Sequence, residues 1–222
     1  MESKELRKMI KPFFKGFAEE QGFIFQTPKT MVRINQDILQ VIGFEKPGGF
    51  YCNIAIQPLY IAEEVIVLNF GNRINHFKVN LPGIYGESSD VEEVKKDFTE
   101  IKNLLETNAI PWFNEVRNPQ GIVSFLENLP NEQHMVMLDP FMRKERLAYS
   151  CLYLHNYEKA LKYFEEILEM LNNDNSYNMR IFLSLINNIN AIKEMIREHP
   201  EKIDGLLQDN IQYTRSKLKL KI

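Results

Sequence analysis

The sequence predicts an α+β fold: an N-terminal helix packed on a four- or five-stranded antiparallel sheet, followed by a C-terminal all-α helical segment. Two changes in apolar spacing carry this prediction. Apolar residues recur every three or four positions over residues 6–17, alternate with polar residues through much of 23–70, and return to helical spacing after residue 89. A group of strands followed by a group of helices is typical of this fold class.

The first expected element is a helix with one apolar face. Its members follow the spacing i, i+3, i+4, i+7, i+8 and i+11: Leu6, Met9, Ile10, Phe13, Phe14 and Phe17. Gly22 is expected to end this element, because glycine accepts the left-handed conformation common just past a helix.

Five segments have strand character, namely residues 23–25, 31–35, 37–45, 50–60 and 65–70. The run Pro47-Gly48-Gly49 favours a hairpin turn between the third and the fourth. Within residues 50–60 the alternation predicts one packed face, which holds Phe50, and a wetter face that carries Tyr51, Asn53 and Gln57.

Helical spacing resumes where Ser89 with Glu92, or Asp90 with Glu93, has the spacing of a capping box. Pro111 is expected to break this helix, since proline disfavours the helical conformation in the residue before it. Asn118 and Pro119 then open a short helix that stops before Pro130.

The last third of the chain contains four apolar stripes at helical spacing, with turns at residues 154–156 and 199–200. The polar stretch 130–139 is the expected junction between two parts. We therefore predict a helix-sheet domain over residues 1–129 and an α-helical segment over residues 140–222.

Residues 1–129 resemble a bacterial family of unknown function, the DUF-four-three-zero-four type. The resemblance is carried by short motifs: Lys11-Pro12-Phe13, Gly22-Phe23, Arg33, Leu39-Gln40-Val41-Ile42, residues 50–58, Phe70-Gly71-Asn72-Arg73-Ile74 and Ile110-Pro111-Trp112-Phe113. The family has no established activity, so the resemblance implies a fold and no particular chemistry.

Residues 140–172 are similar to one tetratricopeptide repeat, in which small residues lie where two helices cross. The matching positions are Leu147, Ala148, Cys151, Tyr157, Ala160 and Phe164. A solenoid needs about three repeats to stand alone, so we interpret this segment as one TPR-like helical hairpin packed against its neighbours.

Charge and composition exclude several classes of function. The 222 residues carry 27 Lys+Arg against 30 Asp+Glu, and this balance argues against a dedicated nucleic-acid binder. No apolar run reaches the ~20 residues of a membrane span. The charged first residues do not have the pattern of a secretory signal peptide. Cys52 and Cys151 are expected to be buried free thiols in a reducing cytosol, with a disulfide between them as the alternative. A cytoplasmic protein is therefore predicted.

Local catalytic and ligand motifs are absent from the sequence. The four histidines, His76, His134, His155 and His199, lack the spacing of a metal motif. The glycine-containing turns lack the lysine and hydroxyl residue of a phosphate loop, and no serine has the nucleophile-elbow pattern. No metal and no cofactor are therefore expected, with a site assembled from distant segments as the open alternative.

Two strand arginines indicate a candidate binding surface. Arg33 and Arg73, on the wet face of a sheet, could hold a carboxylate or a phosphate in a planar fork. Four further residues could line the same surface: Tyr51, Gln57, Tyr60 and Trp112. The alternative is structural, with both arginines bonded to Asp37 or to a nearby glutamate.

The basic run Arg215–Lys221 could contact RNA or an anionic surface, or could be a solvated terminus.

These observations favour a non-catalytic cytoplasmic protein-interaction module whose partner is another protein. One alternative is an immunity or defence-associated protein that blocks a toxin. Another is an enzyme with a non-local site on the sheet face, built from Arg33, Arg73, His76 and a carboxylate. A homodimer through a sheet edge or the helical segment stays open.

Overall fold

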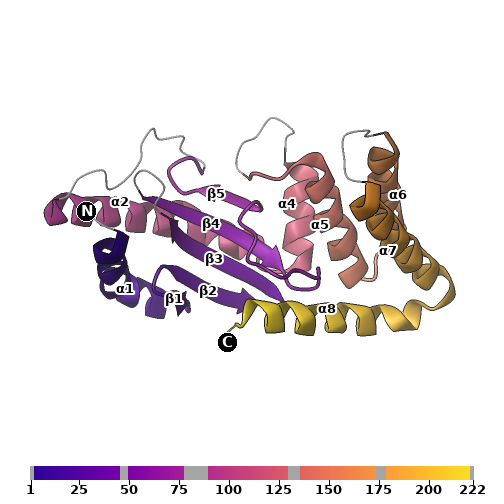
Figure 1. Ribbon diagram of the computed structural model, residues 1–222, viewed down its shortest axis with the longest axis horizontal. Coiled ribbons are helices and arrows are strands. Elements are labelled where there is room, and N and C mark those ends of the chain that lie inside the picture. Colours follow the sequence, from indigo (N-terminus) through magenta and orange to yellow (C-terminus); the bar gives the residue numbers. More distant parts are fainter. Residues whose placement is uncertain (1–2, 46–49, 78–89, 130–135, 174–178, 221–222) are drawn as a thin grey trace.

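The computed structural model describes residues 3–45, 50–77, 90–129, 136–173 and 179–220. It contains an N-terminal helix, a five-stranded antiparallel sheet and several C-terminal helices (Figure 1), which confirms the predicted α+β class. The turn at residues 46–49, the helix start at Ser89 and His134 lie outside the described residues.

Helix α1 (Ser3–Glu20) leads into a sheet whose strands are neighbours in chain order. The strands are β1 (Ile24–Thr27), β2 (Thr30–Asn35), β3 (Ile38–Glu45), β4 (Tyr51–Pro58) and β5 (Gly71–Arg73). Gly22 has a φ of 72°, as expected of the residue that ends α1. Gln36 and Asp37, both with positive φ, make the tight turn from β2 to β3.

The strand predicted over residues 65–70 is wrong, because the last strand is the short β5. The backbone of residues 65–67 bonds to a side chain instead of to a neighbouring strand. Gln57 Nε2 donates to the carbonyl of Val65 at 3.2 Å, and the Val67 N–H donates to Gln57 Oε1 at 3.0 Å. This segment folds back over Gln57, which was expected on the wetter face and is 1% exposed. Tyr51, expected on the same face, is 8% exposed and lies against Arg73.

The break predicted at Pro111 is also wrong. Helix α2 (Val91–Leu104) continues through a π-helical turn, η1 (Leu105–Ala109), into α3 (Ile110–Glu115). The Ile110 N–H donates to the Leu105 carbonyl, five residues back. This wide turn directly before Pro111 accommodates a residue that has no N–H and whose ring crowds the preceding turn.

Helices α1 and α2 cover one face of the sheet through aromatic side chains. Phe14 of α1 lies 4.9 Å from Phe44 of β3, and Phe98 of α2 lies 5.4 Å from Phe50, measured between ring centroids. Helix α4 (Pro119–Asn128) follows α3 and begins as expected, with Asn118 Oδ1 accepting from the Gly121 N–H at 2.8 Å.

The C-terminal part contains α5 (Pro140–Tyr153), α6 (Tyr157–Asn173), α7 (Met179–Glu198), the 3₁₀ turn η2 (Pro200–Lys202) and α8 (Ile203–Leu218). Helix α8 runs back along the sheet, so the end of the chain lies beside the β1 side (Figure 1). There Gln26 Nε2 donates to the Lys219 carbonyl at 2.7 Å.

The N- and C-terminal parts share one buried core. The Tyr60 and Ser150 hydroxyls lie 2.7 Å apart, and Asn210 Nδ2 donates to the Tyr60 carbonyl at 3.0 Å. These contacts fix the segment after β4 against both α5 and α8. The division into domains at residues 130–139 stays a prediction.

Candidate functional site

The structure does not bring the six candidate residues together on one surface. Arg33 is opposite Gln40, which is opposite Ile56, whereas Arg73 is opposite Asn53. Ile56 and Asn53 are three positions apart on β4, so their side chains point to opposite faces of the sheet. Arg33 and Arg73 therefore cannot hold one ligand between them, and the sheet-face site that combined them with His76 is not assembled.

Arg33 lies on the helix-covered face and joins three elements. Its Nη1 donates to the Gln21 carbonyl at 2.7 Å, its Nε donates to Gln40 Oε1, and its Nη2 donates to Asn114 Oδ1 at 3.4 Å. Its guanidinium carbon lies 4.6 Å from the centroid of the Phe23 ring, and burial lowers the pKa of Arg33. These contacts use the side chain to fasten the end of α1 and α3 to the sheet.

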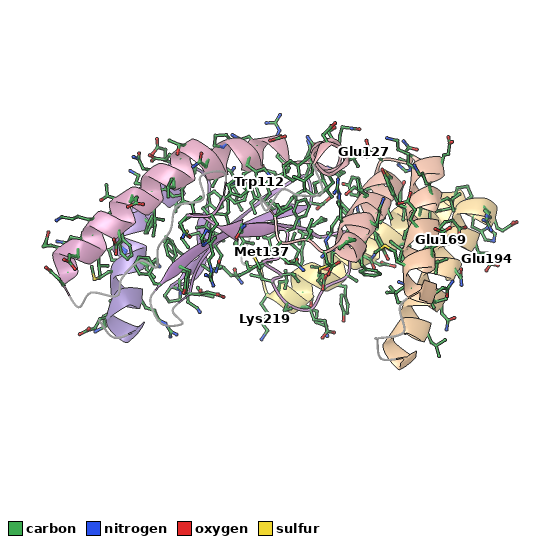
Figure 2. All side chains as sticks on the ribbon, turned by 90° about the horizontal axis from the view of Figure 1, so that it is seen from above. Trp112, Glu127, Met137, Glu169, Glu194 and Lys219 are labelled. Carbon is green, nitrogen blue, oxygen red and sulfur yellow. The ribbon has the colours of Figure 1, made fainter. Side chains whose placement is uncertain are left out.

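The other candidate residues are also committed to packing. The Arg73 guanidinium carbon lies 3.7 Å from the Tyr51 ring centroid, and Tyr60 and Trp112 are fully buried. Trp112 lies between the helix layer and the sheet (Figure 2), where its ring packs against aromatic neighbours that include Phe70 and Phe77. Asp37 bonds to neither Arg33 nor Arg73; it accepts from Tyr153 at 3.0 Å and from Arg215 at 3.4 Å.

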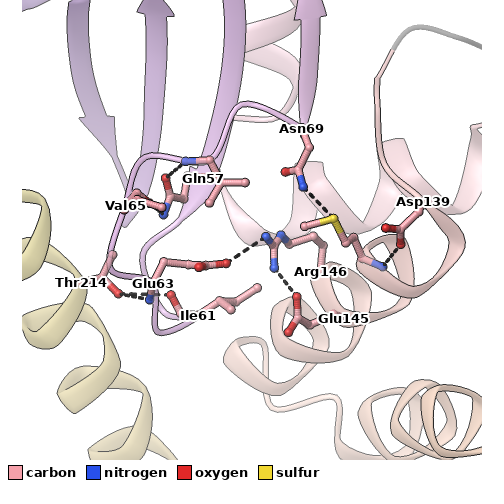
Figure 3. Close-up of polar contacts among 11 residues, drawn as sticks. Gln57, Ile61, Glu63, Val65, Asn69, Asp139, Glu145, Arg146 and Thr214 are labelled. Carbon is pink, nitrogen blue, oxygen red and sulfur yellow. Dashed lines mark hydrogen bonds and ion pairs between the residues drawn. The ribbon is translucent and has the colours of Figure 1, made fainter. Parts of the chain in front are cut away.

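A buried charged cluster surrounds Arg146 of α5 (Figure 3). The sequence analysis did not predict it. Arg146 Nη2 lies 3.3 Å from Glu63 Oε1, and Nη1 pairs with Glu145. The side chains of Arg146, Glu63 and Glu145 are 2%, 26% and 19% exposed. Burial, followed by the negative charges of Glu63 and Asp139, raises the pKa of Glu145 although Arg146 acts in the opposite direction.

The Arg146 cluster has a structural task. The Glu63 N–H donates to Thr214 Oγ1 at 3.1 Å, and the Thr214 hydroxyl donates to the Ile61 carbonyl at 3.2 Å. The cluster thus holds the segment after β4 between α5 and α8. One sequence pattern could have predicted this cluster: Arg146 and Ser150 lie one helical turn apart within an apolar stripe.

A shallow groove of about 660 Å³ lies along the outward side of α1. It is lined by Arg7, Lys8, Lys11, Pro12, Lys15 and Pro28, and we call it the α1 groove. The helical period places four cations on one side of α1, and the turn between β1 and β2 supplies Pro28 opposite them. The sequence pattern showed these cations only as the polar side of a helix.

Most cations of the α1 groove have no carboxylate partner. Of the residues that the structure describes, none forms an ion pair with Arg7, Lys8 or Lys11, while Lys15 lies 3.7 Å from Glu19 in an exposed pair. Lys11 Nζ lies 5.7 Å from the centroid of the Phe25 ring, which fixes this lysine beside β1. Three of the four groove cations therefore carry a charge that no ion pair with a described residue offsets.

Charge is strongly segregated along the chain, although the whole is nearly balanced. Residues 1–35 carry seven Lys+Arg against four Asp+Glu, and residues 215–222 carry four Lys+Arg and no acidic residue. Residues 36–214 carry 16 Lys+Arg against 26 Asp+Glu. Both basic segments reach β1, each through its own contact: Lys11 lies over the Phe25 ring, and Gln26 bonds to the Lys219 carbonyl. Lys219 lies far from Glu169 and Glu194 of the helical part (Figure 2).

Across the described residues, no group of three His, Cys, Asp or Glu side chains could hold a metal ion. None of the helices among these residues has the length and apolar content to cross a bilayer. Cys52 and Cys151 are buried free thiols; burial raises the pKa of Cys151 to about 11 and that of Cys52 further. A buried thiol with a raised pKa is a poor nucleophile.

No family model, curated protein or solved structure matches the chain. The resemblances to the family of unknown function and to a tetratricopeptide repeat therefore stay predictions.

Proposed function

We propose that the chain is a non-catalytic, cytoplasmic protein-interaction module that binds an acidic protein partner at its basic end. The observation that carries this proposal is that Arg7, Lys8 and Lys11 of the α1 groove form no ion pair with any described residue, in a chain whose middle is acidic. Complementary charge of this kind steers partners and sets orientation more than it sets raw affinity.

Two features favour a protein over a nucleic acid as the partner. The residues that line the α1 groove include no aromatic side chain on which a base could stack. A polyanion that extends beyond the groove would meet the acidic excess of residues 36–214. A protein with a local acidic patch avoids both problems.

The proposal is tested by capture from the cells that express the chain naturally. The tagged wild type is compared with Lys8→Glu/Lys11→Glu/Lys15→Glu and with a control of equal charge, Lys96→Glu/Lys162→Glu/Lys202→Glu, which changes exposed lysines elsewhere. We expect the wild type and the control to retain the same protein, identified by mass spectrometry, and the groove variant to lose it. The purified partner should then bind directly.

The proposal fails if all three forms retain the same proteins. It also fails if nuclease treatment abolishes the capture, because the retained material would then be held through nucleic acid.

A further inference from the structure

We infer that the α1 groove recognises a short linear segment in which several carboxylates flank one apolar side chain. This inference rests on the proposed function, since it specifies which part of an acidic protein the groove accepts. Three properties of the groove support it: an apolar floor, a helix carbonyl without its usual partner, and a small size.

The floor of the groove is predominantly apolar although four of its six lining residues are cations. Pro28 is exposed in the turn after β1, and Pro12 is exposed on α1. The other lining residues are Arg7, Lys8, Lys11 and Lys15, whose long side chains have aliphatic stems that supply apolar surface. An apolar side chain placed on this floor would be surrounded by ammonium groups, so its flanking residues should be acidic.

Pro12 also changes the hydrogen bonding of α1. It lies inside the helix and has no N–H to donate to the carbonyl four residues back, which belongs to Lys8. Both Lys8 and Pro12 line the groove. A peptide has backbone N–H groups that suit such an acceptor, whereas a phosphate backbone has no donor.

The size of the groove limits the ligand. A volume of about 660 Å³ falls within the range of small-ligand sites, roughly 300–1,000 Å³. A folded partner would need about 800 Å² of surface on each side. The groove by itself therefore accommodates a few residues, one of which is the apolar anchor.

The end of α8 adds positive charge beside β1, although none of its described residues lines the α1 groove. Lys219 is exposed, and none of the ion pairs between described residues includes it. Lys217 is already paired with Glu64 at 3.0 Å, so among the described lysines of this end Lys219 is the one without an ion-pair partner.

The test uses the full chain and fluorescently labelled synthetic peptides, with binding followed by anisotropy. The probe is Glu-Asp-Glu-Leu-Glu-Asp-Glu; its matched controls replace the central leucine by serine or every carboxylate by its amide. A single-stranded oligonucleotide and vesicles of anionic phospholipid are measured alongside.

We expect the leucine peptide to bind, and each control peptide to bind about tenfold more weakly, because each loses either the apolar anchor or the charge. Added salt should weaken binding of the leucine peptide. Lys8→Glu/Lys11→Glu/Lys15→Glu should weaken it about tenfold or more, and Lys96→Glu/Lys162→Glu/Lys202→Glu should leave it unchanged. Pro28→Asp should weaken the leucine peptide more than the serine peptide.

Equal binding of the leucine and serine peptides would contradict the claim that an apolar side chain anchors the ligand. Tighter binding of the oligonucleotide or the vesicles would contradict the claim that the ligand is a peptide. If no peptide binds while partner capture still depends on Lys8, Lys11 and Lys15, the linear segment is wrong and the proposed function stands. If neither depends on these lysines, both are wrong.

Discussion

The Arg146 cluster and the α1 groove are two concentrations of charge in opposite environments. Arg146 is removed from water and has a carboxylate on either side, whereas Arg7, Lys8 and Lys11 are exposed and have none among the described residues. A buried charge without a partner costs several kcal/mol, while an exposed one is solvated by water. Burial therefore commits Arg146 to structure and leaves the groove cations available to a ligand.

The largest effect is expected at Arg146. Arg146→Ala leaves Glu63 and Glu145 close together without the cation between them, so we expect a loss of about 3–5 kcal/mol in the free energy of unfolding. Chemical denaturation measures this loss. The variant Arg146→Met/Glu145→Gln/Glu63→Gln, which removes all three charges, should recover a large part of it; no recovery would show that packing, and not charge, sets the cost.

The next largest effects are expected at Arg33 and Arg73, which should contribute differently to the free energy of unfolding although the sequence analysis gave them the same role. Arg33→Ala removes the donor to the buried Gln40 and to the Gln21 carbonyl, at a cost of about 1–3 kcal/mol. Arg73→Ala removes a stacking contact with Tyr51, at a cost of about 0.5–1 kcal/mol. Parallel denaturation curves compare them, and an equal or reversed order would contradict their assignment to differently packed faces.

The pH dependence of the free energy of unfolding tests the raised pKa of Glu145 in the Arg146 cluster. A carboxyl whose pKa is raised by folding binds its proton more tightly in the folded state, so stability is lost as pH rises from the ordinary glutamate pKa, about 4.3, through the raised pKa. Glu145→Gln cannot titrate. We therefore expect the variant to gain stability relative to the wild type as pH rises through this window, measured by unfolding curves at matched pH.

A constant difference between Glu145→Gln and the wild type would contradict the burial of this carboxyl. Taking the difference between variant and wild type cancels the pH dependence that other titrating groups contribute. One such group is Glu127, whose pKa is lowered by its hydrogen bond from Lys159.

The smallest effect per substituted residue is expected in the α1 groove. Lys8→Glu/Lys11→Glu/Lys15→Glu changes exposed side chains and should alter the free energy of unfolding by no more than about 0.5 kcal/mol per site. Thermal unfolding of this variant and of the Lys96→Glu/Lys162→Glu/Lys202→Glu control provides the measurement. A loss confined to the groove variant would assign its lysines to the fold.

Local patterns predicted most of the elements. The apolar spacing of residues 6–17 and the glycine at position 22 predicted α1, and Asn118-Pro119 predicted the start of α4. Two local rules failed where a neighbouring interaction outweighed them. The π-helical turn accommodates Pro111 within a continuing helix, and the side chain of Gln57 bonds to the backbone that was expected to form a strand.

The sequence by itself determined the fold class, because apolar periodicity decides which face of each element must leave water. Only the tertiary structure decided what the charged residues do. Strand register separates Arg33 from Arg73, the packing of α5 encloses Arg146, and the return of α8 brings Lys219 to the strand that Lys11 already contacts. The physical reason is that the cost of a charge depends on its solvation and its partners, and both are set by segments far away in the chain.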